Sequence, residues 1–160
     1  MTGIPNVNKL WMVYHLITLL CFLLFALYDY QHHKIRSPAL AVFFLWCLFS
    51  IPVTLYSRPI LPWYYVVLYC LFGFITGFCL LLLIAIVTDG GIGGGDIKLV
   101  ALTGILYGAS GLLLVLIFGC MAALLHYGFC RLRKKNRLER IPFAPYLFLG
   151  CCLYTLPQLF

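Results

Sequence analysis

Four acidic side chains are the residues of this chain best suited to chemistry: Asp29, Asp89, Asp96 and Glu139. The chain is 64% hydrophobic, and an ionisable group at a membrane helix is costly enough to be a functional candidate. Glu139 stands among six cations, where we expect a solvated surface charge. Asp29 and Asp96 each border an apolar run and are the strongest candidates. Asp89 is expected to be a loop acid whose role is at most to tune that pair.

A pair of carboxylates can hydrolyse a peptide bond without a metal or a covalent nucleophile. One carboxylate activates a water molecule, and the other, protonated, polarises the carbonyl group and later donates its proton. Two carboxyl groups in contact share one proton, because they do not both ionise. The run GGIGGG at 90–95 directly precedes Asp96, and glycines without a Cβ let a peptide backbone approach closely. These residues favour an aspartic peptidase.

Other interpretations of the same residues stay open. The glycine run could be a flexible loop or an anion-binding helix start, although it lacks the G-K-S/T ending of a Walker loop. Asp96 could be the N-cap of the helix that follows it. Asp29 could be a structural partner of Lys34 or Arg36 at the membrane interface.

The composition requires elements that can sit in lipid. Only 9% of the 160 residues are charged, whereas a soluble domain has about 25%. The net charge of +7 could suggest that the chain binds nucleic acid. Six of the eleven cations, however, lie at 131–140, a stretch expected to be a loop between two membrane spans. No nucleic-acid partner is therefore expected. Eight cysteines occur without any C-x-x-C, mostly in apolar runs. We expect them to be small hydrophobic residues, with no metal and no cofactor.

The apolar runs predict an all-α, polytopic membrane protein with about six transmembrane helices in a single domain, 1–160. A span needs about 20 apolar residues. The pairs Gly73–Gly77 and Gly104–Gly108 are spaced to let helices approach closely. The expected helices cover 10–28, 39–56, 63–87, 97–108, 111–130 and 142–160.

Six crossings put three loops on one face, together with both aspartates. The loops at 30–38, 88–96 and 131–140, with their edges, carry nine of the eleven cations. The positive-inside rule assigns that face to the cytoplasm. Asp29 and Asp96 are expected to emerge there from two different helices.

Three stretches of the sequence resemble one family. The stretch Gly93-Gly94-Gly95-Asp96-Ile97-Lys98-Leu99 looks like the G-x-G-D-x-K-L signature of type IV prepilin peptidases and the related archaeal preflagellin peptidases, which are intramembrane aspartic proteases. Asp29 is followed by a basic segment with isoleucine at the family's offset, Ile35, although Arg36-Ser37 replaces the usual Pro-Asn. The stretch at 141–145, IPFAP, is similar to the family's I-P-F-G-P, with alanine in place of glycine.

The resemblance implies an activity and a set of site residues. It makes Asp29 and Asp96 the catalytic pair, and it puts Gly93, Gly95 and Lys98 in the substrate-binding loop. The implied reaction is removal of short basic leaders from pilin, pseudopilin or competence pilin precursors at the cytoplasmic face of a prokaryotic cell membrane. Longer members carry a zinc-binding insert with two C-x-x-C pairs and also methylate the product. This sequence has neither the insert nor a C-x-x-C, so methylation is not implied.

Two further functions remain alternatives. An ion-coupled transporter or channel also uses intramembrane aspartates and glycine-broken helices, although no inverted repeat is visible here. An inactive family member that acts as a pilus assembly factor would retain the motifs without cleavage. Proton uptake into vesicles would indicate the first alternative, and cleavage by purified protein would exclude the second.

Overall fold

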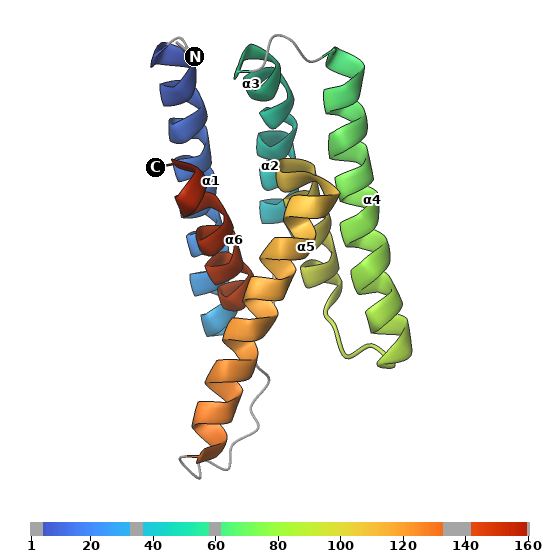
Figure 1. Cartoon of the computed structure of the whole chain (residues 1–160). Coiled ribbons are helices and arrows are strands. Elements are labelled where there is room, and N and C mark those ends of the chain that lie inside the picture. Colours follow the sequence, from blue (N-terminus) through green and yellow to red (C-terminus); the bar gives the residue numbers. More distant parts are fainter. Residues whose placement is uncertain (1–4, 33–36, 58–61, 133–141, 160) are drawn as a thin grey trace.

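A computed structural model describes residues 5–32, 37–57, 62–132 and 142–159 of the chain. Within these ranges the structure is helical and contains no strand, so the predicted all-α class is confirmed. Figure 1 shows the helices arranged as a bundle along one general direction. The helices are α1 (Pro5–His32), α2 (Ser37–Leu48), α3 (Ser50–Ser57), α4 (Trp63–Val87), α5 (Gly94–Leu132) and α6 (Ala144–Leu159).

A break at Phe49 separates α2 from α3, and Pro52 explains it. Proline has no N–H, and its ring clashes with the carbonyl group four residues earlier, here that of Leu48. The N–H of Phe49 donates to the carbonyl oxygen of Trp46 at 3.1 Å, which closes the last turn of α2. The two helices together form one kinked stretch, Ser37–Ser57.

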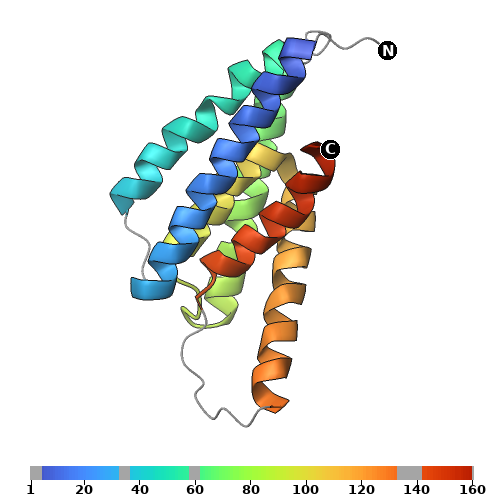
Figure 2. The same cartoon turned by 90° about the vertical axis from the view of Figure 1, so that its left-hand side faces the viewer.

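The helix α5 consists of two parts joined at Gly108. This residue has φ 66° and ψ −179°, a backbone conformation open almost only to glycine. The two parts run in opposite directions in Figure 1 and in Figure 2, so the chain turns back on itself there. The ring of Tyr69 on α4 fills the space that a Cβ at Gly108 would need. Its hydroxyl donates to the backbone carbonyl of Tyr107, so a carbonyl beside the break has a partner.

Glycines allow α4 and α6 each to make a backbone contact with α5. A Cβ on Gly73 of α4 would overlap the carbonyl group of Gly104 on α5, and a Cβ on Gly104 would overlap that of Gly73. Beyond the turn, a Cβ on Gly150 of α6 would overlap the carbonyl oxygen of Val115. The small residues predicted to allow close helix packing therefore do so between α4 and the first part of α5.

The outward faces of the helices are strongly apolar. Leu16, Leu20 and Leu24 on α1, and Phe72 and Leu83 on α4, are each more than half exposed. Water would not tolerate a continuous surface of this kind, whereas lipid tails do. The surface is that of a multi-pass membrane protein.

The number of spans differs from the predicted six. Within the described ranges four stretches are long and apolar enough to cross a membrane: Lys9–His32, Ser37–Ser57, Trp63–Val87 and Gly94–Phe129. The helices expected at 97–108 and 111–130 are the two parts of α5, which meet at Gly108, and the first part is shorter than the roughly 20 residues of a typical span. The helix α6, with 16 residues, is shorter as well. Six crossings therefore stay a prediction.

The charged segments used to assign the faces lie mostly outside the described residues. These are Lys34, Arg36 and the cations at 133–140. The cytoplasmic position of that face also stays a prediction.

Candidate functional site

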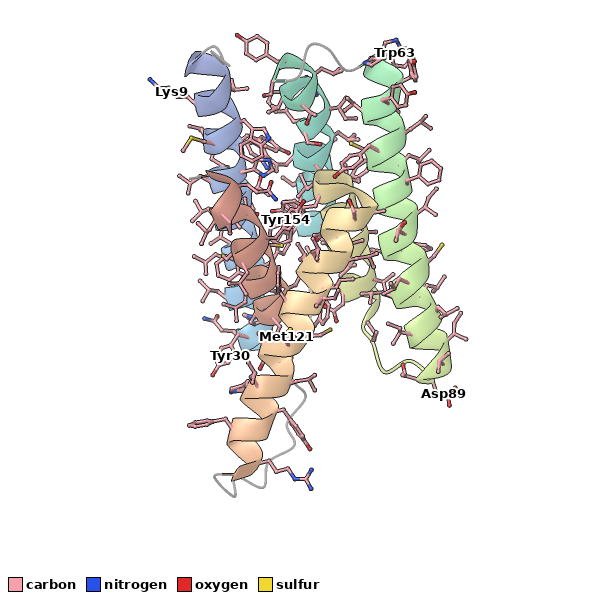
Figure 3. The ribbon with its side chains drawn as sticks, in the orientation of Figure 1. Lys9, Tyr30, Trp63, Asp89, Met121 and Tyr154 are labelled. Carbon is pink, nitrogen blue, oxygen red and sulfur yellow. The ribbon has the colours of Figure 1, made fainter. Side chains whose placement is uncertain are left out.

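Both aspartates of the proposed pair lie where a helix ends or begins. Asp29 is in the last turn of α1, and Asp96 is the third residue of α5. Figure 3 labels Tyr30, which follows Asp29 in the chain, and Asp89, which lies in the turn before α5. Both labelled residues lie toward the end of the bundle that is away from Trp63. The α1 end and the α4–α5 turn therefore lie toward the same end of the molecule.

Asp29 is held by the start of a helix far away in the sequence. Its Oδ2 atom accepts a hydrogen bond of 3.1 Å from the backbone N–H of Ala144, the first residue of α6. Both residues are buried, with 5% of Asp29 and 1% of Ala144 exposed. A carboxylate at a helix N-terminus receives an N–H donor and lies at the positive end of the helix dipole. The contact joins the last turn of α1 to the first turn of α6.

The sequence at the start of α6 explains why Ala144 donates. The carbonyl oxygen of Phe143 accepts the N–H groups of Tyr146 and Leu147 at 3.1 and 3.2 Å. Pro145 has no N–H to give. The N–H of Ala144 is thus a first-turn donor without a partner in its own helix, and Asp29 supplies that partner.

Asp96 is held by the start of its own helix. The carbonyl oxygen of Gly93 accepts the N–H groups of Asp96 and Ile97 at 3.0 and 3.3 Å. The carboxylate of Asp96 lies beside the backbone of Gly93, the residue that precedes α5. A Cβ at Gly93 would lie 3.2 Å from Oδ2 of Asp96, closer than side chains usually approach. Asp96 is therefore not the N-cap considered from the sequence but a residue of the first turn of α5.

The two carboxyl groups are close enough to interact electrostatically. Asp29 is buried and Asp96 is partly buried. Charges interact more strongly away from water than in it. The arrangement offers the chemistry of a carboxylate dyad.

The remaining candidate residues differ in their exposure. Gly95 is partly buried, whereas Lys98 is exposed on α5. Asp89 is exposed and has φ 47°, and the next residue, Gly90, has φ 82°. These left-handed conformations form the turn that leads from α4 toward the glycine run. In Figure 3 the side chain of Asp89 points outward from the tip of that turn.

An apolar cavity of about 490 Å³ lies between α1 and α2. It extends along α1 from Cys21 to Tyr28, and along α2 from Ala39 to Trp46. Tyr28, one of its lining residues, is adjacent to Asp29 in the chain. Apolar side chains of a bound molecule would find a matching environment there.

Among the described residues, no three or more His, Cys, Asp or Glu side chains are gathered as a metal site would require. The cysteines whose side chains are described are free thiols.

The contact that sequence reasoning missed is the one between Asp29 and Ala144. The stretch at 141–145 was noted only for its resemblance to a family pattern. A signal for its role was present, because the N–H groups in the first turn of a helix have no acceptor within that helix. Nothing in the sequence, however, indicated that Asp29 would be the acceptor.

Sequence comparisons give independent information about this chain. The sequence model of the type IV leader peptidase family matches residues 16–128, a range that contains both Asp29 and Asp96. The chain is also similar to the prepilin leader peptidase/N-methyltransferase of Bacillus subtilis (strain 168), with 37% identity over 111 residues. That match covers 66% of this chain and 43% of the relative, so the chain spans less than half the length of that curated protein. No solved structure gives a significant match.

Proposed function

Since the chain belongs to the type IV leader peptidase family, we propose that it removes leader peptides from prepilin-like precursors by aspartic catalysis at Asp29 and Asp96. The observation that carries the proposal is that α1 and α5 bring these two carboxyl groups, one buried and one partly buried, toward the same end of the bundle and close enough to interact electrostatically. They come from helices far apart in the sequence. Two acids that different helices bring together are an arrangement suited to acid–base catalysis.

The proposed reaction follows from the chemistry of the pair. One carboxylate takes a proton from a water molecule, which attacks the scissile carbonyl carbon. The other, protonated, donates a hydrogen bond to the carbonyl oxygen and then passes its proton to the leaving amine. The backbone N–H of Ala144 holds Asp29, and Asp96 lies beside the backbone of Gly93. Such support restricts the carboxylates to few orientations, which the reaction requires.

The glycine run supplies the proposed substrate path. Gly93 and Gly95 leave room for an extended backbone beside Asp96, and Lys98 contributes a positive charge on the exposed face of the same helix. The apolar cavity that begins at Tyr28 would take apolar side chains of the precursor. Residues 1–160 would act as one membrane-embedded domain, with the pair near the cytoplasmic face.

The proposal is limited to the peptidase step. The relative from Bacillus subtilis is named for both leader peptidase and N-methyltransferase activity. This chain spans less than half of that protein and contains no C-x-x-C pair. Methyl transfer therefore forms no part of the function proposed for the chain.

Cleavage of a candidate precursor tests the proposal. The chain is co-expressed with prepilin-like precursors, and purified protein is then mixed with them in liposomes. We expect a shorter product on a gel, with its new N-terminus identified by mass spectrometry. The double variant Asp29→Asn, Asp96→Asn, recovered from membranes in equal amount, should leave the precursor intact. Equal processing by the double variant would overturn the assignment, and no processing by folded wild type would favour an assembly factor.

A further inference from the structure

We propose that the first turn of α6 is a positioning element of the active site, and that the backbone N–H of Ala144 fixes the orientation of the Asp29 carboxylate. The inference rests on the proposed function, because it assigns a role in the reaction of the same aspartate pair. Ala144 acts through Asp29 and is therefore a positioning residue. Its contribution comes from the main chain, so its side-chain type does not reveal it.

The hydrogen bonds of the α6 start make this contact specific. Tyr146 and Leu147 use their N–H groups within the turn, and Pro145 has none. Ala144 is left as the donor that points out of the turn, and it meets Oδ2 of Asp29 at 3.1 Å. A buried N–H without an acceptor is costly. The N–H of Ala144 and the carboxylate of Asp29 therefore each supply the hydrogen-bond partner that the other needs.

The contact has a consequence for the geometry of the pair. A carboxylate that binds a donor through one oxygen loses free rotation about its last bond, so the direction of its other oxygen is set. Catalytic groups need to be held within about 0.5 Å and 10–20° of their working geometry. Asp29 lies in the last turn of α1, and the support from α6, another helix, supplies this accuracy.

The helix α6 is well placed to act as that support. It packs on α1, which carries Asp29, and on α5, which carries Asp96. Gly150 of α6 and Gly119 of α5 let the two backbones meet. A Cβ on Gly119 would overlap the carbonyl oxygen of Tyr146 on α6. A rigid α6 thus fixes the position of the Asp29 carboxylate relative to the helix of its partner.

A matched pair of substitutions at Ala144 tests the proposal. Ala144→Pro removes the N–H, and proline is well tolerated at the first position of a helix. Ala144→Val adds similar bulk in the same buried place but keeps the N–H. Both proteins are purified as monodisperse fractions, and kcat and KM for precursor cleavage are measured in liposomes. A third variant, Ala144→Gly, keeps the N–H without the bulk and should recover most of the rate.

We expect kcat of Ala144→Pro to fall about tenfold to hundredfold below that of Ala144→Val, as for the loss of one hydrogen bond to a charged group. KM should change by less than about twofold, because substrate binding does not use the contact. Equal kcat values for the proline and valine variants would overturn the proposal, since bulk alone would then explain the loss. A raised KM with an unchanged kcat would overturn it as well.

A spectroscopic measurement covers the case in which Ala144→Pro does not fold. In ¹⁵N-labelled protein the amide proton of Ala144 should resonate downfield, as expected for a donor to a carboxylate, and should move upfield in Asp29→Ala. An unchanged resonance would overturn the proposal. The proposed function fails separately, if Asp29→Asn still cleaves. The proposed function still stands, and only the role of Ala144 is refuted, if the aspartates are essential but the proline and valine variants have equal kcat values.

Discussion

Each aspartate of the pair places its carboxylate against the first turn of a helix, Asp29 against α6 and Asp96 against α5. Backbone N–H groups at a helix start are strong, fixed donors for a carboxylate. Unlike side chains, they do not change rotamer, and they stay in place while a proton moves. At the scale of single residues, main-chain atoms at a helix start therefore lie against each of the two groups that are proposed to react, and one of them donates to Asp29.

The first expectation concerns the individual acids. Asp29→Asn and Asp96→Asn should each reduce leader cleavage by at least about a thousandfold, because each carboxylate has a separate role and an amide serves neither. Asp89→Asn should retain most of the activity, since Asp89 is exposed at the tip of a turn. The measurement is single-turnover cleavage in liposomes. A nearly normal rate for either of the first two variants, or complete loss for Asp89→Asn, would show that the wrong acids were chosen.

The second expectation uses two neighbouring glycines as a matched pair. A Cβ at Gly93 would lie 3.2 Å from Oδ2 of Asp96, whereas a Cβ at Gly94 would meet nothing within 4 Å. Gly93→Ala should therefore displace the carboxylate and lower kcat about tenfold, a typical effect of shifting a catalytic group slightly. Gly94→Ala should behave like wild type in the same assay. If both alanine variants lose activity equally, the glycines serve loop flexibility and not room for Asp96.

Local sequence could predict one half of the site and not the other. Asp96 follows its glycines directly, so its place at a helix start was evident from the chain itself. The partner of Asp29 is 115 residues away, and no pattern of spacing connects the two. Hydrogen bonds between elements depend on how helices pack, which periodicity and propensity do not determine. The sequence therefore indicated the acids but not what orients Asp29.

At the scale of elements, the turn at Gly108 decides how the site is built. It lets the two parts of α5 run in opposite directions, so that the first packs on α4 and the second packs on α6. The sequence predicted separate helices at 97–108 and 111–130, and the break falls where the first was expected to end. The sequence could not show the positive φ or the ring of Tyr69 that covers it.

The third expectation tests this turn against a control in the same element. Gly108→Ala should lower the free energy of unfolding by about 2 kcal/mol or more, because alanine is strained at this φ and ψ and overlaps the ring of Tyr69. Gly128→Ala, in the later part of α5 with open space around it, should raise stability by about 0.5–1 kcal/mol, since alanine favours a helix. Thermal unfolding in detergent measures both. A stabilised Gly108→Ala would mean that α5 is continuous in the protein.

The kink between α2 and α3 shows how an element boundary can be anticipated. The segment 39–56 was expected as one helix, and the structure divides it at Phe49. Pro52 was a sufficient signal, because a proline interrupts the hydrogen bond of the residue four positions earlier. A prediction from hydropathy alone does not detect the break, since a kinked helix is as apolar as a straight one.

At the scale of the whole molecule, the fourth expectation concerns topology. A reporter fused after Lys135 should lie in the cytoplasm and one fused at Arg58 should lie outside, because nine of the eleven cations belong to one set of loops. Both fusion points lie outside the described residues. Accessibility of the reporters in intact cells is the measurement. Reporters on the same side would refute an odd number of crossings between the two points, and reversed sides would refute the cytoplasmic position of the aspartate pair.

The turn at Gly108 also has a consequence for the surrounding bilayer. Residues 94–107 of α5 span only about 21 Å at 1.5 Å per residue, whereas the hydrocarbon core of a typical membrane is about 30 Å thick. A helix that is too short for its membrane is accommodated by local thinning of the lipid. Thinning beside α4 and α5 would bring the aqueous phase nearer to Asp96. The acyl-chain length of the host lipid then becomes a variable that controls how easily the water consumed in hydrolysis reaches the carboxylates.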